Sequence, residues 1–74
     1  MEQYKNLGSN SGIRAYEIGS DFVRIRFSSG AEYLYTYQSA GSANIEEMKR
    51  LAYAGVGLNS FIMLNVKTQY AGKS

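Results

Sequence analysis

The chain contains no cysteine, no histidine and no proline. Without cysteine and histidine it has no disulfide, no thiol nucleophile, no imidazole acid–base group and no zinc site of the usual ligand types. The serines also have no histidine base that could activate them for nucleophilic catalysis. These absences predict a protein that is not an enzyme and that uses no metal and no cofactor.

Long apolar runs are absent as well. No stretch approaches the roughly 20 apolar residues that a membrane-spanning helix needs, and no apolar signal-like segment follows Met1. A small secreted domain would normally carry disulfides. We therefore expect a cytoplasmic protein with no membrane partner. Its 74 residues allow one domain with a small core, so that single core substitutions have large effects.

Charge of one sign is also scarce. The formal net charge is +2, but between residues 9 and 70 six basic residues stand against five acidic ones. Such a balance produces no long-range attraction for nucleic acid. Any basic surface must therefore come from a local arrangement of side chains.

Three segments alternate between apolar and other residues: 13–18 (IRAYEI), 22–27 (FVRIRF) and 32–37 (EYLYTY). Turn-forming residues separate them, which predicts a three-stranded antiparallel β-meander. In 44–55 the apolar residues recur at helical spacing; Asn44 is the expected N-cap, Gly55 the expected stop, and Glu46 and Arg50 an expected surface pair. The segment that starts at Leu58 could be a strand, but Asn59 or Ser60 as N-cap and the spacing of Leu58, Ile62 and Val66 favour a second short helix.

The segment YLYTY (33–37) raises the question of which way its tyrosines point. A two-residue turn would place Tyr33 and Tyr35 opposite Arg26 and Arg24 on an exposed face. A three-residue turn at residues 28–30, with Gly30 last, would place them opposite Ile25 and Val23 and pair Arg26 with Glu32. Ser29-Gly30 suits a tight two-residue turn poorly, and opposite charges prefer to face each other across strands. Tyr33 and Tyr35 are therefore predicted to lie mostly in the core, with Tyr37 partly exposed.

The fold class predicted is α+β, with three antiparallel strands followed by two helices packed on one face of the sheet. The expected core consists of Ile13, Ala15, Val23, Ile25, Phe27, Tyr33, Tyr35, Ile45, Met48, Leu51, Ala52, Leu58, Phe61 and Ile62. The first hairpin stays open at this stage. A loop of residues 19–21 directs Ile13 and Ala15 inward but sets Arg14 opposite Arg26. That repulsion is relieved if a phosphate, Glu17 or Glu32 lies between them, or if the register is different.

In its order of motifs the chain resembles the KTSC domain family. The shared features are SNSGI followed by a tyrosine (9–16), VRIRF, SSGAEYLYTY, the helix end LAYAGVGLNSFI and a final Tyr70, so that the resemblance spans 9–70. It implies a domain at 9–70 with a flexible lead-in at 1–8 and a flexible tail at 71–74. The matching family positions, expected to be mainly structural, are Gly30, Tyr33, Tyr35, Gly55, Gly57 and Asn59. Unlike the usual pattern, residues 38–43 lack a proline.

The family is found in bacterial and phage-type proteins and at the C-terminus of some lysyl-tRNA synthetases, which implies an association with RNA and no catalytic residues. The first functional hypothesis is accordingly weak binding of RNA or another single-stranded nucleic acid. The residues expected to carry it are Arg14, Arg24, Arg26, Tyr37, Lys49, Arg50 and Lys67. The alternative is a protein-interaction module in which the open edge of the third strand pairs with a partner or with a second copy.

Overall fold

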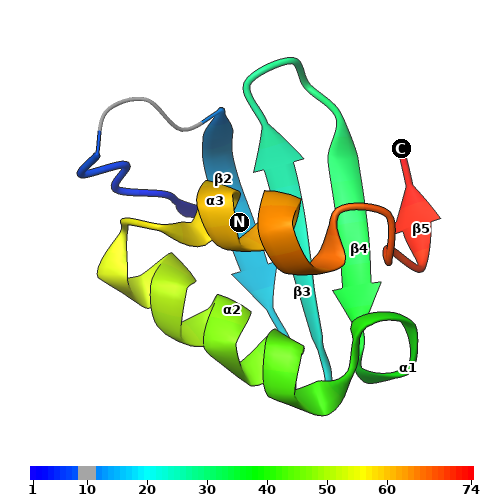
Figure 1. The fold of residues 1–74 in the computed structure, drawn as a ribbon. Helices are drawn as coiled ribbons and strands as arrows, with labels where there is room; N and C mark the ends of the chain where they lie inside the picture. Colours follow the sequence, from blue (N-terminus) through cyan, green and yellow to red (C-terminus); the bar gives the residue numbers. More distant parts are fainter. Residues whose placement is uncertain (9–11) are drawn as a thin grey trace.

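The computed structural model describes residues 1–8 and 12–74, and its central element is an antiparallel sheet (Figure 1). The strands follow one another across the sheet in chain order, β1-β2-β3-β4-β5. Their bounds are Glu2–Gln3 for β1, Ile13–Ile18 for β2, Phe22–Phe27 for β3, Glu32–Thr36 for β4 and Gly72–Lys73 for β5. The α+β class is confirmed. The predicted number of three strands was too low, because both ends of the chain add a short edge strand.

The helices cover one face of this sheet (Figure 1). A single turn, α1 (Tyr37–Ala40), is followed by the long helix α2 (Ser42–Ala54). The next helical segment begins as α3 (Leu58–Phe61) and continues as the π-helical turn η1 (Ile62–Val66). The segment from Leu58 onward is thus helical, as predicted.

Of the two ends of α2, only the C-terminal end lies where the sequence predicted it. Gly55 closes the helix in the left-handed conformation, with φ 77°, and its N–H donates to the Leu51 carbonyl. At the start, the helix begins at Ser42 instead of after Asn44. The Asn44 side chain donates to the Ala40 carbonyl at 2.8 Å, within the α1 turn that sequence reasoning treated as a loop.

The β3–β4 hairpin has the predicted register. Val23 faces Tyr35, Ile25 faces Tyr33 and Arg26 faces Glu32. The Phe27 N–H donates to the Ala31 carbonyl and the Gly30 N–H to the Phe27 carbonyl, both at 2.9 Å. Gly30 has φ 96°, a value that favours glycine. The three-residue turn therefore sends the tyrosines to the helix-covered face.

The register of the β2–β3 hairpin, which the sequence left open, differs from the one that a loop of residues 19–21 would give. Ile18 faces Val23 and the Gly19 N–H donates to the Phe22 carbonyl, so the loop is only Ser20-Asp21. The Phe22 ring lies over Gly19, where an added Cβ would come within 2.0 Å of the ring, and this contact favours the tight loop. A β-bulge between Ile13 and Ala15 then takes up the one-residue shift.

Because the loop has only two residues, Arg14 does not stand opposite Arg26. Arg26 faces Ala15 instead, and Tyr16 faces Ile25 on the core side. Ala15 is buried, but it lies on the opposite face of the sheet from the core, to which sequence reasoning had assigned it. Tyr16 takes its place in the core, against the edge of the Tyr53 ring.

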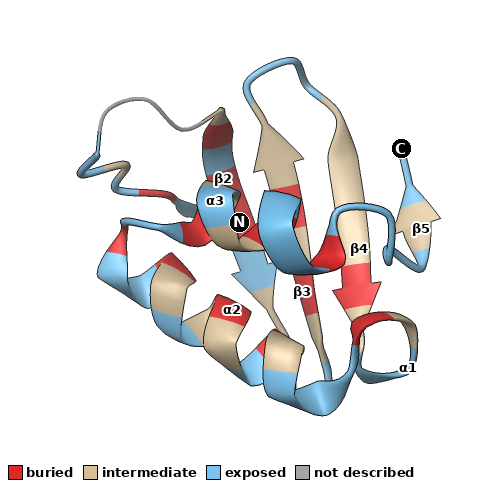
Figure 2. Cartoon of the chain, in the orientation of Figure 1, coloured by how far each residue is buried: buried red, intermediate tan, exposed pale blue. Residues whose placement is uncertain are grey.

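The core lies between the sheet and the helices (Figure 2). Most of its predicted members are buried there, while Phe27, Tyr33, Leu51 and Phe61 are only partly buried. Among the described residues, four buried hydrophobic ones were not predicted: Tyr4, Tyr16, Ala40 and Val66. Tyr4 belongs to the segment expected to be a loose lead-in, yet it is 3% exposed and its hydroxyl accepts from the Leu58 N–H.

Candidate nucleic-acid interface

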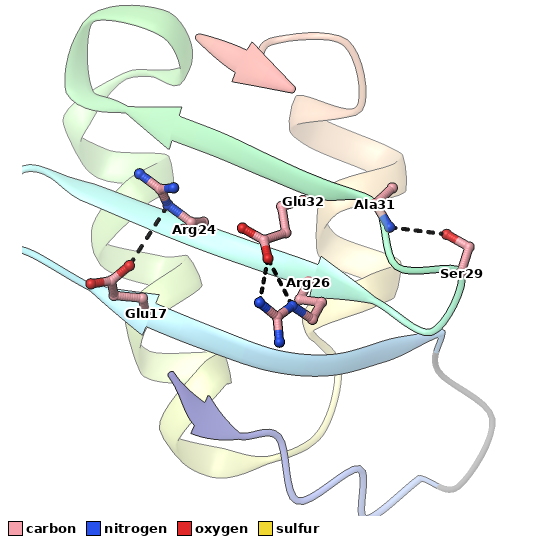
Figure 3. Close-up of polar contacts among 6 residues, drawn as sticks. All are labelled: Glu17, Arg24, Arg26, Ser29, Ala31 and Glu32. Atoms are coloured by element: carbon pink, nitrogen blue, oxygen red, sulfur yellow. Dashed lines mark hydrogen bonds and ion pairs between the residues drawn. The ribbon is translucent and has the colours of Figure 1, made fainter. Parts of the chain in front are cut away.

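Two of the predicted arginines, Arg24 and Arg26, are paired with carboxylates on the polar face of the sheet (Figure 3). Arg26 donates to Glu32 from Nε at 2.8 Å and also from Nη2. Arg24 Nε lies 3.7 Å from Glu17 on the neighbouring strand. These two arginines and two glutamates cancel in formal charge, so the two pairs add no net positive charge to the sheet face. The cross-strand pairing of Arg26 with Glu32 confirms that part of the sequence prediction.

The predicted residues on and near α2 are paired as well. Lys49 Nζ lies 2.8 Å from Glu46 and donates to the Ser20 carbonyl, while Tyr37 donates to the same Glu46 carboxylate at 2.6 Å. Arg50 donates to Glu47 at 2.9 Å and not to Glu46, its predicted partner. The hydrogen bonds from Lys49 and Tyr37 lower the pKa of Glu46, and the one to Glu46 raises the pKa of Tyr37.

The predicted basic residues therefore do not form one surface. Arg24 and Arg26 lie on the sheet face away from the helices, whereas Lys49 and Arg50 belong to α2, on the other side of the sheet. Arg14 sits at the bulge of β2, and Lys67 directly follows η1. Tyr37 is 37% exposed, as expected, but it begins α1 and does not end the strand as the sequence had predicted.

An aromatic groove, which we define by Phe27, Tyr33, Tyr35 and Tyr70, lies on the core side of the sheet, and its volume is about 440 Å³. The ring centroids of Tyr33 and Tyr70 are 4.9 Å apart, with the rings nearly perpendicular at 84°. Phe27 contacts Tyr33 edge to face at 5.4 Å, and Tyr35 stacks on Tyr33 at 6.4 Å. Tyr35 forms the buried floor, while Tyr33, Phe27 and Tyr70 keep exposed ring surface.

Local structure explains how this groove arises. The turn at 28–30 aligns Phe27, Tyr33 and Tyr35 on one face of two adjacent strands. The chain leaving η1 then turns back towards β4, where the Ala71 N–H donates to the Leu34 carbonyl at 2.6 Å. This return holds Tyr70 against the rings of Tyr33 and Tyr35.

Two lysines belong to the same region. Lys67 lines the groove, and Lys73 Nζ lies 5.4 Å from the centroid of the Tyr33 ring. No aspartate or glutamate is among the described residues that line the groove. Sequence reasoning identified Lys67 but missed Tyr70 and Lys73 as site residues. The aromatic character of Tyr70, close after Lys67, was the only signal available in the sequence.

The positions shared with the resembled family have structural roles here. Gly30, Gly55 and Gly57 all adopt positive φ, at 96°, 77° and 85°. Gly57 precedes α3, and Asn59 lies within that helix and is not its N-cap. Both tyrosines line the groove, but Tyr35 is a fully buried core residue whereas Tyr33 lies partly buried at the edge of the core.

Burial raises the pKa of Tyr35 to about 12, and the nearby Tyr33 and Tyr70 hydroxyls add to the effect. In the unfolded chain the phenol ionises near pH 10, so the contribution of this group to stability is complete below about pH 10 and is lost as the pH rises towards 12. We expect the free energy of unfolding to fall by about 1–2 kcal/mol over this interval, since solvent at the groove screens part of the full shift.

Urea unfolding at a series of alkaline pH values measures this loss. Tyr35→Phe, which has no ionisable group, is the matched control and is expected to flatten most of the dependence. A part persists because burial also raises the pKa of Tyr16. An unchanged pH dependence in Tyr35→Phe would contradict the assignment.

The edge of β4 is not open, contrary to the expectation behind the protein-interaction hypothesis. Glu32 exchanges backbone hydrogen bonds with Ser74, at 2.9 and 2.8 Å, and Leu34 faces Gly72 in β5. The predicted flexible tail at 71–74 thus supplies the strand that covers this edge. A partner strand could pair with β4 only by displacing β5.

Comparison with known proteins adds no relative: no family model, no curated protein and no solved structure matches this chain. The resemblance to the KTSC family therefore stays a prediction. Within residues 1–8 and 12–74, no helix has the length and apolar character needed to cross a membrane. The same residues contain no cluster of three or more acidic side chains that could hold a metal ion.

Proposed function

We propose that this protein is a small non-catalytic module that binds single-stranded nucleic acid weakly through the aromatic groove. The observation that carries the proposal is the combination of exposed tyrosine and phenylalanine rings with Lys67, in a groove that no described acidic residue lines, and with Lys73 beside the Tyr33 ring. This differs from the interface predicted from the sequence, in which arginines of the sheet face made the contacts.

Stacking is the interaction that the groove is suited to provide. Every base has a flat π-surface, and stacking on an aromatic side chain contributes about 1–3 kcal/mol per base with little dependence on sequence. Tyr33 and Tyr70 are held by perpendicular ring contacts, so little side-chain entropy remains to be lost on binding. The groove of about 440 Å³ has room for one or two bases, which is consistent with weak binding.

The positive charges of Lys67 and Lys73 favour an anionic nucleic-acid strand over a neutral aromatic ligand. Lys67 and Lys73 can each contact a backbone phosphate on either side of a stacked base. With two such contacts, the logarithm of the binding constant should fall with the logarithm of the salt concentration with a slope of about −1.4. The paired arginines would add little to this slope because their carboxylate partners already neutralise them.

Titration of isotope-labelled protein with short single-stranded RNA and DNA at low salt tests the proposal. We expect amide and ring signals of Tyr33, Lys67 and Tyr70 to shift. Tyr70→Ala should weaken binding roughly 5- to 150-fold, the equivalent of one lost stacking contact. Tyr53→Ala removes a more exposed tyrosine, on α2, and is the matched control that should leave binding unchanged.

A second pair of variants compares two members of the interface predicted from the sequence, Lys67 in the groove and Arg50 outside it. Lys67→Gln should lower the salt slope by about 0.7, whereas Arg50→Gln, which removes a cation already paired with Glu47, should not change it. Two outcomes would overturn the proposal. One is the absence of any shift with either nucleic acid, and the other is a set of shifts confined to Arg24 and Arg26.

A further inference from the structure

We propose that a second hollow, beside the β-bulge at the start of β2 and the adjoining end of β3, binds a phosphate group. We define this basic hollow by Lys5, Arg14, Arg26 and Ser28, which are among the residues that line its volume of about 780 Å³. No aspartate or glutamate lines it within the described part of the chain. Ser28 lines both hollows, but the cations on which the inference rests, Lys5, Arg14 and Arg26, do not line the aromatic groove, so the inference stands independently of the proposed function.

The β-bulge of β2 builds one wall of the hollow. Bulges bend a strand and re-aim the side chain of the extra residue. Here the extra residue is Arg14, which has no partner residue in β3 while its neighbours Ile13 and Ala15 face Phe27 and Arg26. The Arg14 carbonyl accepts from the Tyr4 N–H at 2.9 Å. This bond places the segment after β1 beside the bulge. Lys5, the next residue, lines the hollow while its side-chain stem runs past Gly55 at the end of α2.

Arg26 forms another part of the wall, and its orientation is fixed in advance. Glu32, whose side chain is 22% exposed, accepts from Nε and from Nη2 of the guanidinium. Figure 3 shows the guanidinium held by Glu32 on the sheet face, with strand β2 alongside. A guanidinium has five N–H donors, so three remain for a ligand after this pairing. An incoming anion therefore meets a guanidinium that has already lost its rotational freedom.

The charge of the hollow selects an anion. Lys5 and Arg14 add two positive charges beyond the neutral pair of Arg26 and Glu32. Guanidinium groups match the oxygens of phosphate with two parallel hydrogen bonds, and a doubly charged phosphate gains more from them than a carboxylate does. The Ser28 hydroxyl supplies a further donor at the hairpin end.

The size of the hollow indicates what carries the phosphate. A volume of about 780 Å³ far exceeds that of one phosphate group, so the ligand class that fits is a phosphate attached to a larger group, or a pyrophosphate. Free phosphates and nucleotide phosphates share this chemistry. They are separated by the arms of the experiment below.

The experiment is a titration of the labelled protein with pyrophosphate at low salt, followed through the arginine Nε–H and backbone amide signals. We expect shifts of Lys5, Arg14 and Arg26. Arg14→Gln should weaken binding about tenfold, the equivalent of one charge-assisted hydrogen bond, and Lys5→Gln should weaken it less. Arg50→Gln is the control and should bind as the unmodified chain does. Shifts spread evenly over all lysines and arginines, or an unchanged affinity in Arg14→Gln, would overturn the proposal.

Two further experiments identify the source of the phosphate and distinguish this proposal from nucleic-acid binding at the aromatic groove. Short oligonucleotides with and without a 5′-phosphate are compared: a preference for the phosphorylated form assigns the hollow to a nucleotide phosphate, and equal binding assigns it to free phosphates. Tyr70→Ala should leave pyrophosphate binding intact, because Tyr70 lines only the groove. Failure of either site is thereby distinguishable from failure of the other.

Discussion

Tyr4→Ala is expected to destabilise the domain by about 3–5 kcal/mol, although Tyr4 lies in a segment that the sequence marks as a loose lead-in. The side chain is 3% exposed and belongs to the core cluster. Its ring covers part of the core beside Leu58, and its backbone N–H donates to the Arg14 carbonyl. A domain of this size has about 4–11 kcal/mol of stability in total, so the loss would leave a large fraction of the variant unfolded.

Thermal or urea unfolding followed by circular dichroism measures this effect. Tyr4→Phe keeps the ring and loses only the 3.4 Å contact with the Leu58 N–H, so it should cost less than about 1.5 kcal/mol. Leu7→Ala is a second control, since Leu7 is 68% exposed and should tolerate truncation. If Tyr4→Ala proved as stable as Leu7→Ala, the N-terminal segment would not be part of the core.

Tyr35→Ala is expected to have an effect of similar size, about 3–5 kcal/mol, for a different reason. Tyr35 is among the largest fully buried side chains and stands opposite Val23 at the centre of the sheet. Its ring also supports Tyr33 and Tyr70 from below, with centroid distances of 6.4 Å to each. Truncation would leave a cavity in the core and remove the floor of the aromatic groove.

Tyr33→Ala is the informative comparison, because the two tyrosines are two residues apart on the same strand face. Tyr33 is only partly buried, so its loss should cost clearly less stability than the loss of Tyr35. The same unfolding measurements apply. If Tyr33→Ala lowered the free energy of unfolding as much as Tyr35→Ala or more, the partial burial of Tyr33 and the full burial of Tyr35 would be contradicted.

Sequence reasoning succeeded where local chemistry decides the structure. The Ser-Ser-Gly turn and the pairing of Arg26 with Glu32 were enough to predict the β3–β4 register. The helical face of Ile45, Met48 and Ala52 was also readable from spacing alone. In both cases residues close in sequence determine the outcome.

Sequence reasoning failed where contacts between residues distant in the sequence determine the structure. The burial of Tyr4 depends on Leu58, and the strand at Gly72–Lys73 depends on β4, neither of which a local pattern contains. The β2–β3 register depended on the Phe22 ring lying over Gly19, and the bulge at Arg14 followed from that shift. A one-residue change of loop length therefore reassigned Ala15 and Tyr16 to opposite faces.

The candidate site shows the same division. The arginines were identified as basic residues on one strand, but their effective charge depends on Glu17 and Glu32 from the strands on either side. The tyrosines were correctly directed towards the core side, yet the groove exists because Tyr70 returns to that side from the end of the chain. Residue types were readable from the sequence, and their mutual placement was not.

The order of the strands has a consequence for how the molecule assembles. Short turns join β2 to β3 and β3 to β4, so these three strands can form from contacts between near neighbours in the chain. The strand β5 can pair with β4 only after the helices between them in the sequence have folded onto the sheet. Tyr4 can be buried only when Leu58 has packed beside it. Contacts between segments distant in the sequence have a larger loop-closure entropy cost. We therefore expect the central strands β2–β4 to form first and the edge strands β1 and β5 to pair last. The outermost backbone amides should then be the first to exchange with solvent, and the two edges should open before the central hairpins do.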